Sequence, residues 1–145
     1  MLYDVKKIQG TYKGNIGENL FASTRRKIIL TQMYDNSFIK YYLSNLSQDM
    51  YDFLYLNWKS IDAIEINNPL TIYEIKTRNY YGKNFNYRKS KANLKEIKML
   101  EEAKSLGFKV KTITVWFGKQ WFFWIKEKDF EKDDFYISDL ANRVR

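Results

Sequence analysis

The chain of 145 residues contains no histidine and no cysteine. Without histidine it cannot form a Ser-His-Asp triad or a histidine-containing zinc site. Without cysteine it cannot form a disulfide. Any hydrolytic chemistry must therefore depend on carboxylates, on lysines and on a hard metal ion that binds oxygen ligands.

Long apolar runs and linkers are also missing from the sequence. The N-terminal segment MLYDVKKIQG lacks the apolar core of a signal peptide, and no apolar run is long enough to span a bilayer. Pro69 is the single proline, and no low-complexity tract divides the chain. We therefore expect one intracellular, cytoplasmic domain that covers residues 1–145.

Positive charge is what the chain has in excess. Its 25 Lys and Arg residues against 17 Asp and Glu residues give a formal net charge of +8 at pH 7. This balance favours a polyanionic partner, either a nucleic acid or an anionic membrane surface. The sequence shows no basic amphipathic anchor, which argues against the membrane.

Hydrophobic periodicity predicts an α/β fold in which helices flank a central mixed sheet. Helices are expected over residues 15–30 and 92–107. Strands are expected over residues 51–56, 60–66, 70–78, 108–118 and 120–126. The segment 37–46 fits either a short helix or a strand. The strands 60–66 and 70–78 are joined by a short turn and are expected to form a hairpin.

The strand 70–78 carries two charges in an otherwise apolar pattern. Residues two apart in a strand share a face, so Glu74 and Lys76 converge on one spot. The hairpin brings Asp62 close to Glu74. Two other pairs with the same spacing, Glu96 with Lys98 and Glu102 with Lys104, lie on the predicted helix. Residues two apart on a helix do not share a face, so we interpret both pairs as solvated surface charge.

Asp62, Glu74 and a backbone carbonyl would form a site of oxygen ligands only. Such a site suits Mg²⁺, which takes few protein carboxylates and keeps several waters. A lysine beside it can orient a water or stabilise charge on a phosphate. These residue types predict phosphodiester hydrolysis that needs no histidine.

The stretches GNIGENLF, SIDAIEI and YEIKTR together resemble the PD-(D/E)XK nuclease superfamily, and within it the archaeal Holliday junction resolvases. The resemblance implies a restriction-endonuclease-like core with elements in the order α-β-β-β-α-β. It also implies that Glu18, Asp62, Glu74 and Lys76 form the catalytic site. Asp62, Glu74 and the carbonyl of Ile75 would bind the metal, while Glu18 would bind a water on the metal or a second ion.

The activity implied by this resemblance is Mg²⁺-dependent cleavage of branched or structured DNA by a homodimer. Mn²⁺ is an expected substitute for Mg²⁺. The basic residues expected to contact nucleic acid are Arg25, Arg26, Arg78, Arg88, Lys89 and Lys91. Aromatic residues in the segment 80–87 could stack on bases. A nuclease of the same fold with another DNA target or an RNA target stays open, as does a non-catalytic nucleic-acid-binding module.

Overall fold

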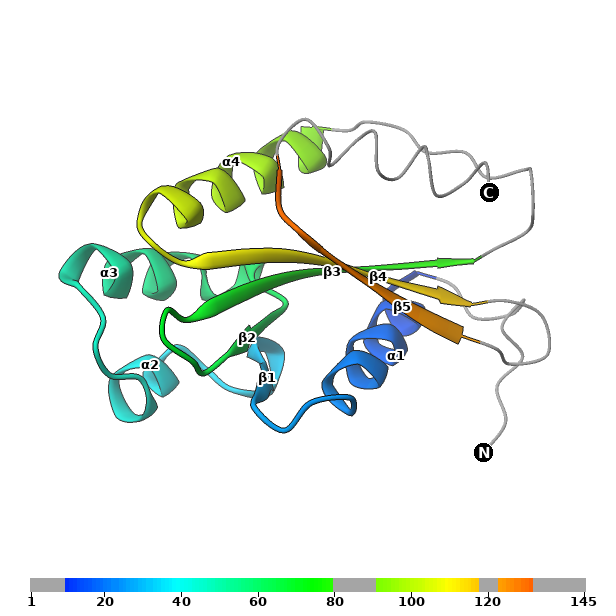
Figure 1. Ribbon diagram of the computed structural model, residues 1–145, viewed down its shortest axis with the longest axis horizontal. Coiled ribbons are helices and arrows are strands. Elements are labelled where there is room, and N and C mark those ends of the chain that lie inside the picture. The colour runs from blue at the N-terminus through cyan, green and yellow to red at the C-terminus, as the bar shows by residue number, and fades with distance from the viewer. Residues whose placement is uncertain (1–9, 80–90, 118–122, 132–145) are drawn as a thin grey trace.

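The computed structural model describes residues 10–79, 91–117 and 123–131 (Figure 1). The elements follow in the order α1 (Gly10–Ala22), β1 (Ile28–Leu30), η2 (Thr31–Met33), α2 (Ser37–Tyr42), α3 (Gln48–Asn57), η3 (Trp58–Ser60), β2 (Ala63–Glu65), β3 (Thr71–Asn79), α4 (Lys91–Ser105), β4 (Lys109–Phe117) and β5 (Phe123–Asp129).

The strands form one mixed sheet in the order β1-β2-β3-β4-β5. β1 with β2, β2 with β3 and β4 with β5 are antiparallel, whereas β3 with β4 is parallel. The expected α/β architecture with a mixed sheet and flanking helices is therefore confirmed. Because a parallel connection needs a crossover, α4 links β3 to β4, and it ends before Gly107, whose φ of +106° suits a helix stop.

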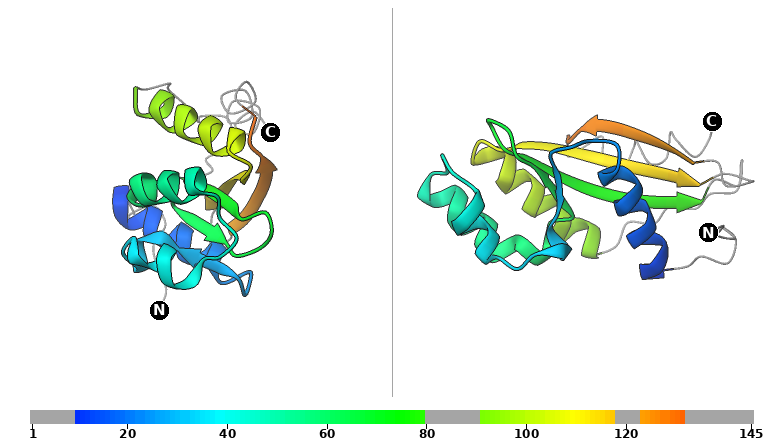
Figure 2. Two further views of the ribbon diagram at one scale, coloured as in Figure 1. Left: turned by 90° about the vertical axis from the view of Figure 1, so that its left-hand side faces the viewer. Right: turned by 90° about the horizontal axis from the view of Figure 1, so that it is seen from below.

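Each face of the sheet has its own apolar core. Alternation along β3 sends Ile72 toward α2, α3 and α4, whereas Tyr73 and Ile75 face α1. Figures 1 and 2 show α4 and α1 on opposite sides of the sheet. By the same alternation, Glu74 and Lys76 lie on the face that α4 covers.

The prediction of a strand over residues 51–56 is wrong, because this segment lies within α3. Ser47 caps the helix by accepting a hydrogen bond from the N–H of Met50. Phe53 and Leu54 are buried in the core, while Tyr55 is exposed. This is burial on one helical face and not the alternation of a strand.

The first predicted helix extends too far toward the C-terminus. α1 ends at Ala22, where the hydroxyls of Ser23 and Thr24 donate to the carbonyls of Leu20 and Phe21. Residues 28–30 then form β1, which pairs with β2. The ambiguous segment 37–46 contains the short helix α2.

Helix α1 lies close to β3 at Gly17. A Cβ atom at this position would lie 2.0 Å from Oγ1 of Thr77 and 3.1 Å from its Cβ and Cγ2 atoms. At 2.0 Å the Oγ1 atom would have to move, and the Cβ and Cγ2 atoms at 3.1 Å leave little space beside it. The absence of a side chain at Gly17 therefore sets how near α1, with the adjacent Glu18, comes to β3.

Gly17→Ala is expected to lower the free energy of unfolding by up to about 2 kcal/mol. The gain in helix propensity, about 1 kcal/mol, is outweighed by overpacking, which costs about 1–3 kcal/mol. Denaturant unfolding in a double-mutant cycle with Thr77→Ala measures the coupling. In the Thr77→Ala background the cost should disappear, and a stabilised Gly17→Ala single variant would contradict this reading.

Candidate functional site

The hairpin of β2 and β3 brings two carboxylates together. Ala63 pairs with Tyr73, so that one step further Asp62 stands opposite Glu74 on the same face. The Oδ2 atom of Asp62 accepts a hydrogen bond of 2.7 Å from the N–H of Ile75. On the other side, the N–H of Thr31 donates to the carbonyl of Asp62 at 3.2 Å. The start of β2 is thus fixed by β3 on one side and by the first residue of η2 on the other.

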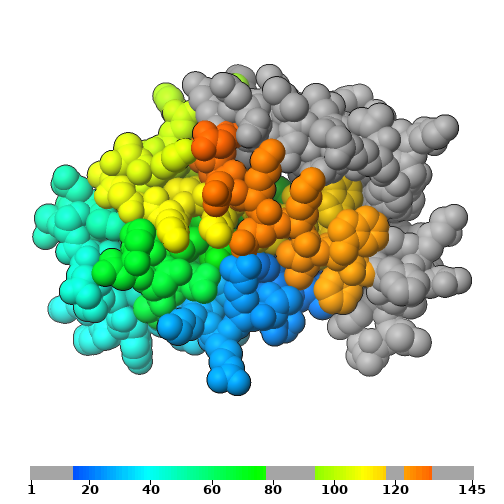
Figure 3. Space-filling view, viewed as in Figure 1, coloured from blue at the N-terminus to red at the C-terminus, as the bar shows by residue number. Residues whose placement is uncertain are grey.

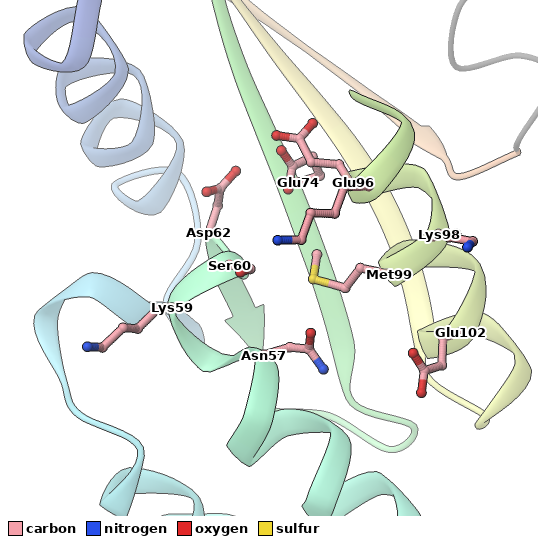
Figure 4. A pocket seen from close by; sticks show the side chains of 10 residues that line it. Asn57, Lys59, Ser60, Asp62, Glu74, Glu96, Lys98, Met99 and Glu102 are labelled. Atoms are coloured by element: carbon pink, nitrogen blue, oxygen red, sulfur yellow. The ribbon is translucent and has the colours of Figure 1, made fainter. Parts of the chain in front are cut away.

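Lys76 connects this pair to a third carboxylate. Its Nζ atom lies 3.0 Å from Oε1 of Glu74 and 2.8 Å from Oε2 of Glu96. Asp62 stands beside Glu74 on the paired strand. A continuous line of polar groups therefore runs from β2 across β3 to α4, and Figure 4 shows Asp62, Glu74 and Glu96 at the same end of one cavity.

The interpretation of Glu96 as solvated surface charge is wrong. The spacing of Glu96 and Lys98 says only that these two do not share a face. It does not say that the glutamate faces solvent, and α4 in fact turns it toward Lys76. The second pair agrees better with the interpretation, because Glu102 is exposed and Lys104 forms an exposed ion pair of 3.0 Å with Glu131.

Asp62, Glu74 and Glu96 surround Lys76, and Lys95 lines the same cavity. Burial raises the pKa of Glu74 well above its ordinary range, and the nearby charge of Asp62 raises it further. Burial also raises the pKa of Asp62, although the hydrogen bond from Ile75 opposes the shift. Burial alone would lower the pKa of Lys76, but Glu74 and Glu96 more than compensate and raise it. Such a site favours the binding of a further cation.

Glu18 interacts electrostatically with Asp62. It is half-buried near the C-terminal half of α1, one residue after the close contact of Gly17 with β3. Burial, with a smaller contribution from the charge of Asp62, raises the pKa of Glu18 to about 7. The charge of Asp62 therefore acts on Glu18, whose expected part in catalysis stays a prediction.

The chemistry of the donor set fits Mg²⁺. Asp62 and Glu74 supply carboxylate oxygens, and the carbonyl of Ile75 points to the same side of β3 as the N–H that Asp62 binds. Within residues 10–79, 91–117 and 123–131, no three acidic side chains surround one point so as to hold an ion as they stand. Two carboxylates and a carbonyl match the few protein ligands that Mg²⁺ takes.

A cavity of about 760 Å³ opens beside the carboxylates, between residues 57–60 and α4, a size typical of ligand sites. Asn57, Ser60 and Met99 line it further along. Lys59 and Lys98 also border it but extend away from the carboxylates (Figure 4). The cavity therefore borders Asp62 and Glu74 on the side that faces α4.

Arg25 is engaged within the chain instead of being presented to a ligand. Its guanidinium donates to the hydroxyl of Tyr73 at 2.7 Å and forms ion pairs with Glu65 and Glu127. Figure 3 shows the segment after α1 next to β5 at the surface. Arg25 therefore joins this segment to β5, and its expected contact with nucleic acid stays a prediction.

The other basic residues expected to contact nucleic acid are less closely defined. Arg26 is exposed. Arg78 lies in β3 and Lys91 at the start of α4, both outside the residues whose side chains are described. Arg88, Lys89 and the aromatic segment 80–87 lie outside the described residues. Their roles remain predictions.

Comparisons of the chain with protein-family models, with curated proteins and with solved structures yield no match. In the described part of the chain, none of the helices combines the length and the apolar character needed to cross a membrane. The functional conclusion therefore depends on the geometry of the site and on the sequence resemblance.

Proposed function

We propose that the protein is a Mg²⁺-dependent endonuclease of the PD-(D/E)XK type that hydrolyses phosphodiester bonds in branched or otherwise structured DNA. One observation carries the proposal: Asp62 and Glu74 face each other across paired strands, and Lys76 lies 3.0 Å from Glu74. The net charge of +8 supports a polyanionic substrate.

Asp62, Glu74 and the carbonyl of Ile75 would hold the metal ion. A Mg²⁺ ion at such a site supplies Lewis-acid polarisation of a phosphodiester group. The hydrogen bond from Ile75 to Asp62 keeps that carboxylate oriented toward β3. Burial of Glu74, whose side chain is 4% exposed, keeps water from competing with the substrate there.

Lys76 would stabilise the charge that develops on the phosphate. An ammonium group has three N–H donors, and two point at Glu74 and Glu96. The third can donate to a phosphate oxygen. Because the donor is already in place, little reorganisation accompanies the attack of water.

Glu18 is suited to take a proton from the attacking water. Burial raises the pKa of Glu18 in the metal-free protein to about 7, so that its carboxylate binds a proton more strongly than an exposed glutamate does. The water oxygen would form the new P–O bond while the P–O bond to the leaving sugar oxygen breaks; the water's proton would go to Glu18, and the leaving oxygen would be protonated from solvent. A two-fold dimer would let two such sites cut two strands of a branched substrate.

The test is a panel of labelled substrates of equal length: a four-way junction, a flap, single-stranded DNA, linear duplex and the matching RNA strands. We expect cleavage of the junction and flap in Mg²⁺ or Mn²⁺ and none in excess EDTA. Equal cutting of all DNAs would indicate a less selective nuclease, and selective cutting of RNA would change the substrate class. Binding of these nucleic acids without cleavage in any metal would contradict the proposal that the protein is an enzyme.

A further inference from the structure

Glu96 is the part of the site that comes from outside the hairpin. It lies in α4, and its carboxylate crosses to Lys76 on β3 with an Oε2–Nζ distance of 2.8 Å. The side chains of Lys76 and Glu96 are 22% and 30% exposed. This contact is therefore sheltered enough to be more than the weak ion pair of an open surface.

The two carboxylates around Lys76 are not equivalent. Glu74 is nearly inaccessible and faces Asp62, so that it is the one suited to a metal ion. A carboxylate that binds a divalent cation attracts an ammonium group less strongly, because its charge is shared. Glu96 lies on the far side of Lys76, on another element, and keeps its charge for the lysine.

Lysine has a long stem with several rotatable bonds, and holding its head in one place requires a partner. With Glu74 alone, the head would lose its anchor when a cation binds. With Glu96, the head stays beside the carboxylate pair.

We infer that Glu96 is a positioning residue: it holds the Lys76 ammonium at the mouth of the carboxylate pair while Glu74 binds the metal ion. This inference rests on the proposed nuclease function. Glu96 does not touch the substrate and acts through Lys76. Partners of this kind, one shell beyond the reacting groups, typically change activity by about 10- to 100-fold when removed.

The kinetic test uses Glu96→Gln, with Glu102→Gln as the matched control. Glu102 lies on the same helix, borders the same cavity and is exposed, so the control makes the same change of charge. Glu96→Gln should lower kcat at least about tenfold with little change in KM, and Glu102→Gln should leave kcat unchanged. Glu96→Asp, which keeps the charge on a shorter stem, should restore part of kcat.

A second readout does not depend on cleavage. In protein labelled with ¹⁵N-lysine, the ammonium signal of Lys76, assigned with Lys76→Arg, should be observable because two carboxylates hold it. Hydrogen exchange of this group should accelerate about tenfold in Glu96→Gln, the scale for losing one hydrogen bond to a charged group. The Glu102→Gln protein should match the wild type, with and without Mg²⁺.

The two measurements distinguish a failure of the inference about Glu96 from a failure of the proposed nuclease function. Unchanged exchange at Lys76 in Glu96→Gln would overturn the inference, whatever the protein cleaves. A rise in KM at constant kcat would also overturn it, because it would place Glu96 in substrate binding. Faster exchange in a protein that cuts no nucleic acid would refute the nuclease while leaving the anchoring of Lys76 by Glu96 in place.

Discussion

Asp62→Asn, Glu74→Gln and Lys76→Ala are each expected to lower the cleavage turnover by about a hundredfold or more. Each removes one charged contributor to the reaction, for which losses of about 10²–10³-fold are usual. The amide variants keep the shape and a hydrogen-bond acceptor, so the contact of Asp62 with the N–H of Ile75 can persist. Single-turnover cleavage of the best substrate measures the effect.

Lys98→Ala and Glu102→Gln are the controls for these variants. Both residues border the same cavity, but Lys98 extends away from the carboxylates (Figure 4). Melting temperatures should show that all five variants are folded. If the control variants lose as much activity as the strand variants, the assignment of the catalytic residues is wrong.

The second large effect is a dependence of the protein's stability on pH and on bound metal. The metal-free protein is expected to lose stability as the pH rises from about 5 to 8. The unfolded chain releases the proton of Glu18 near pH 4.5, whereas the folded protein keeps it to about pH 7. The folded state therefore binds more protons in this window, and the free energy of unfolding falls with pH.

The size of this effect follows from the shift of the Glu18 pKa. One unit corresponds to about 1.4 kcal/mol, and partial exposure of the group reduces the effect, so we expect about 1–3 kcal/mol. Glu74, whose pKa is raised by burial, adds to the same trend. Mg²⁺ bound only by the folded state should restore about 2.7 kcal/mol at a hundredfold excess over its Kd.

Thermal unfolding at pH 5 and pH 8, with and without Mg²⁺, measures both effects. Glu18→Gln should reduce the loss of stability at pH 8. Asp62→Asn and Glu74→Gln should largely remove the stabilisation by Mg²⁺, whereas Glu102→Gln should not. Equal stabilisation of the Asp62→Asn protein by Mg²⁺ would show that the ion binds elsewhere.

The local pattern of the sequence was sufficient for the elements that combine alternation or helical periodicity with clear stops. It predicted β3, the hairpin with β2, and α4 with its end before Gly107. It failed for α3, because aromatic residues such as Tyr51, Phe53 and Tyr55 favour strands by propensity. Burial of Phe53 and Leu54 on one helical face outweighs that propensity.

The candidate site, like the fold, could be predicted from the sequence only in part. That Asp62 and Glu74 would meet could be predicted, because strand alternation and a short turn determine which residues of a hairpin meet. The role of Glu96 could not be predicted, because it depends on the rotation of α4 over the sheet. That rotation is set by packing of Ile97, Leu100 and Ala103 in the core. The separation of Glu96 from Lys76 along the chain does not determine this rotation.

The contact between Gly17 and Thr77 has a consequence for sequence variation. The space between α1 and β3 at this contact is limited, so a larger residue at position 17 requires a smaller one at position 77. Among proteins that share this fold, the two positions should therefore vary as a pair. Such covariation would report the contact of α1 with β3, and with it the placement of Glu18, from aligned sequences alone.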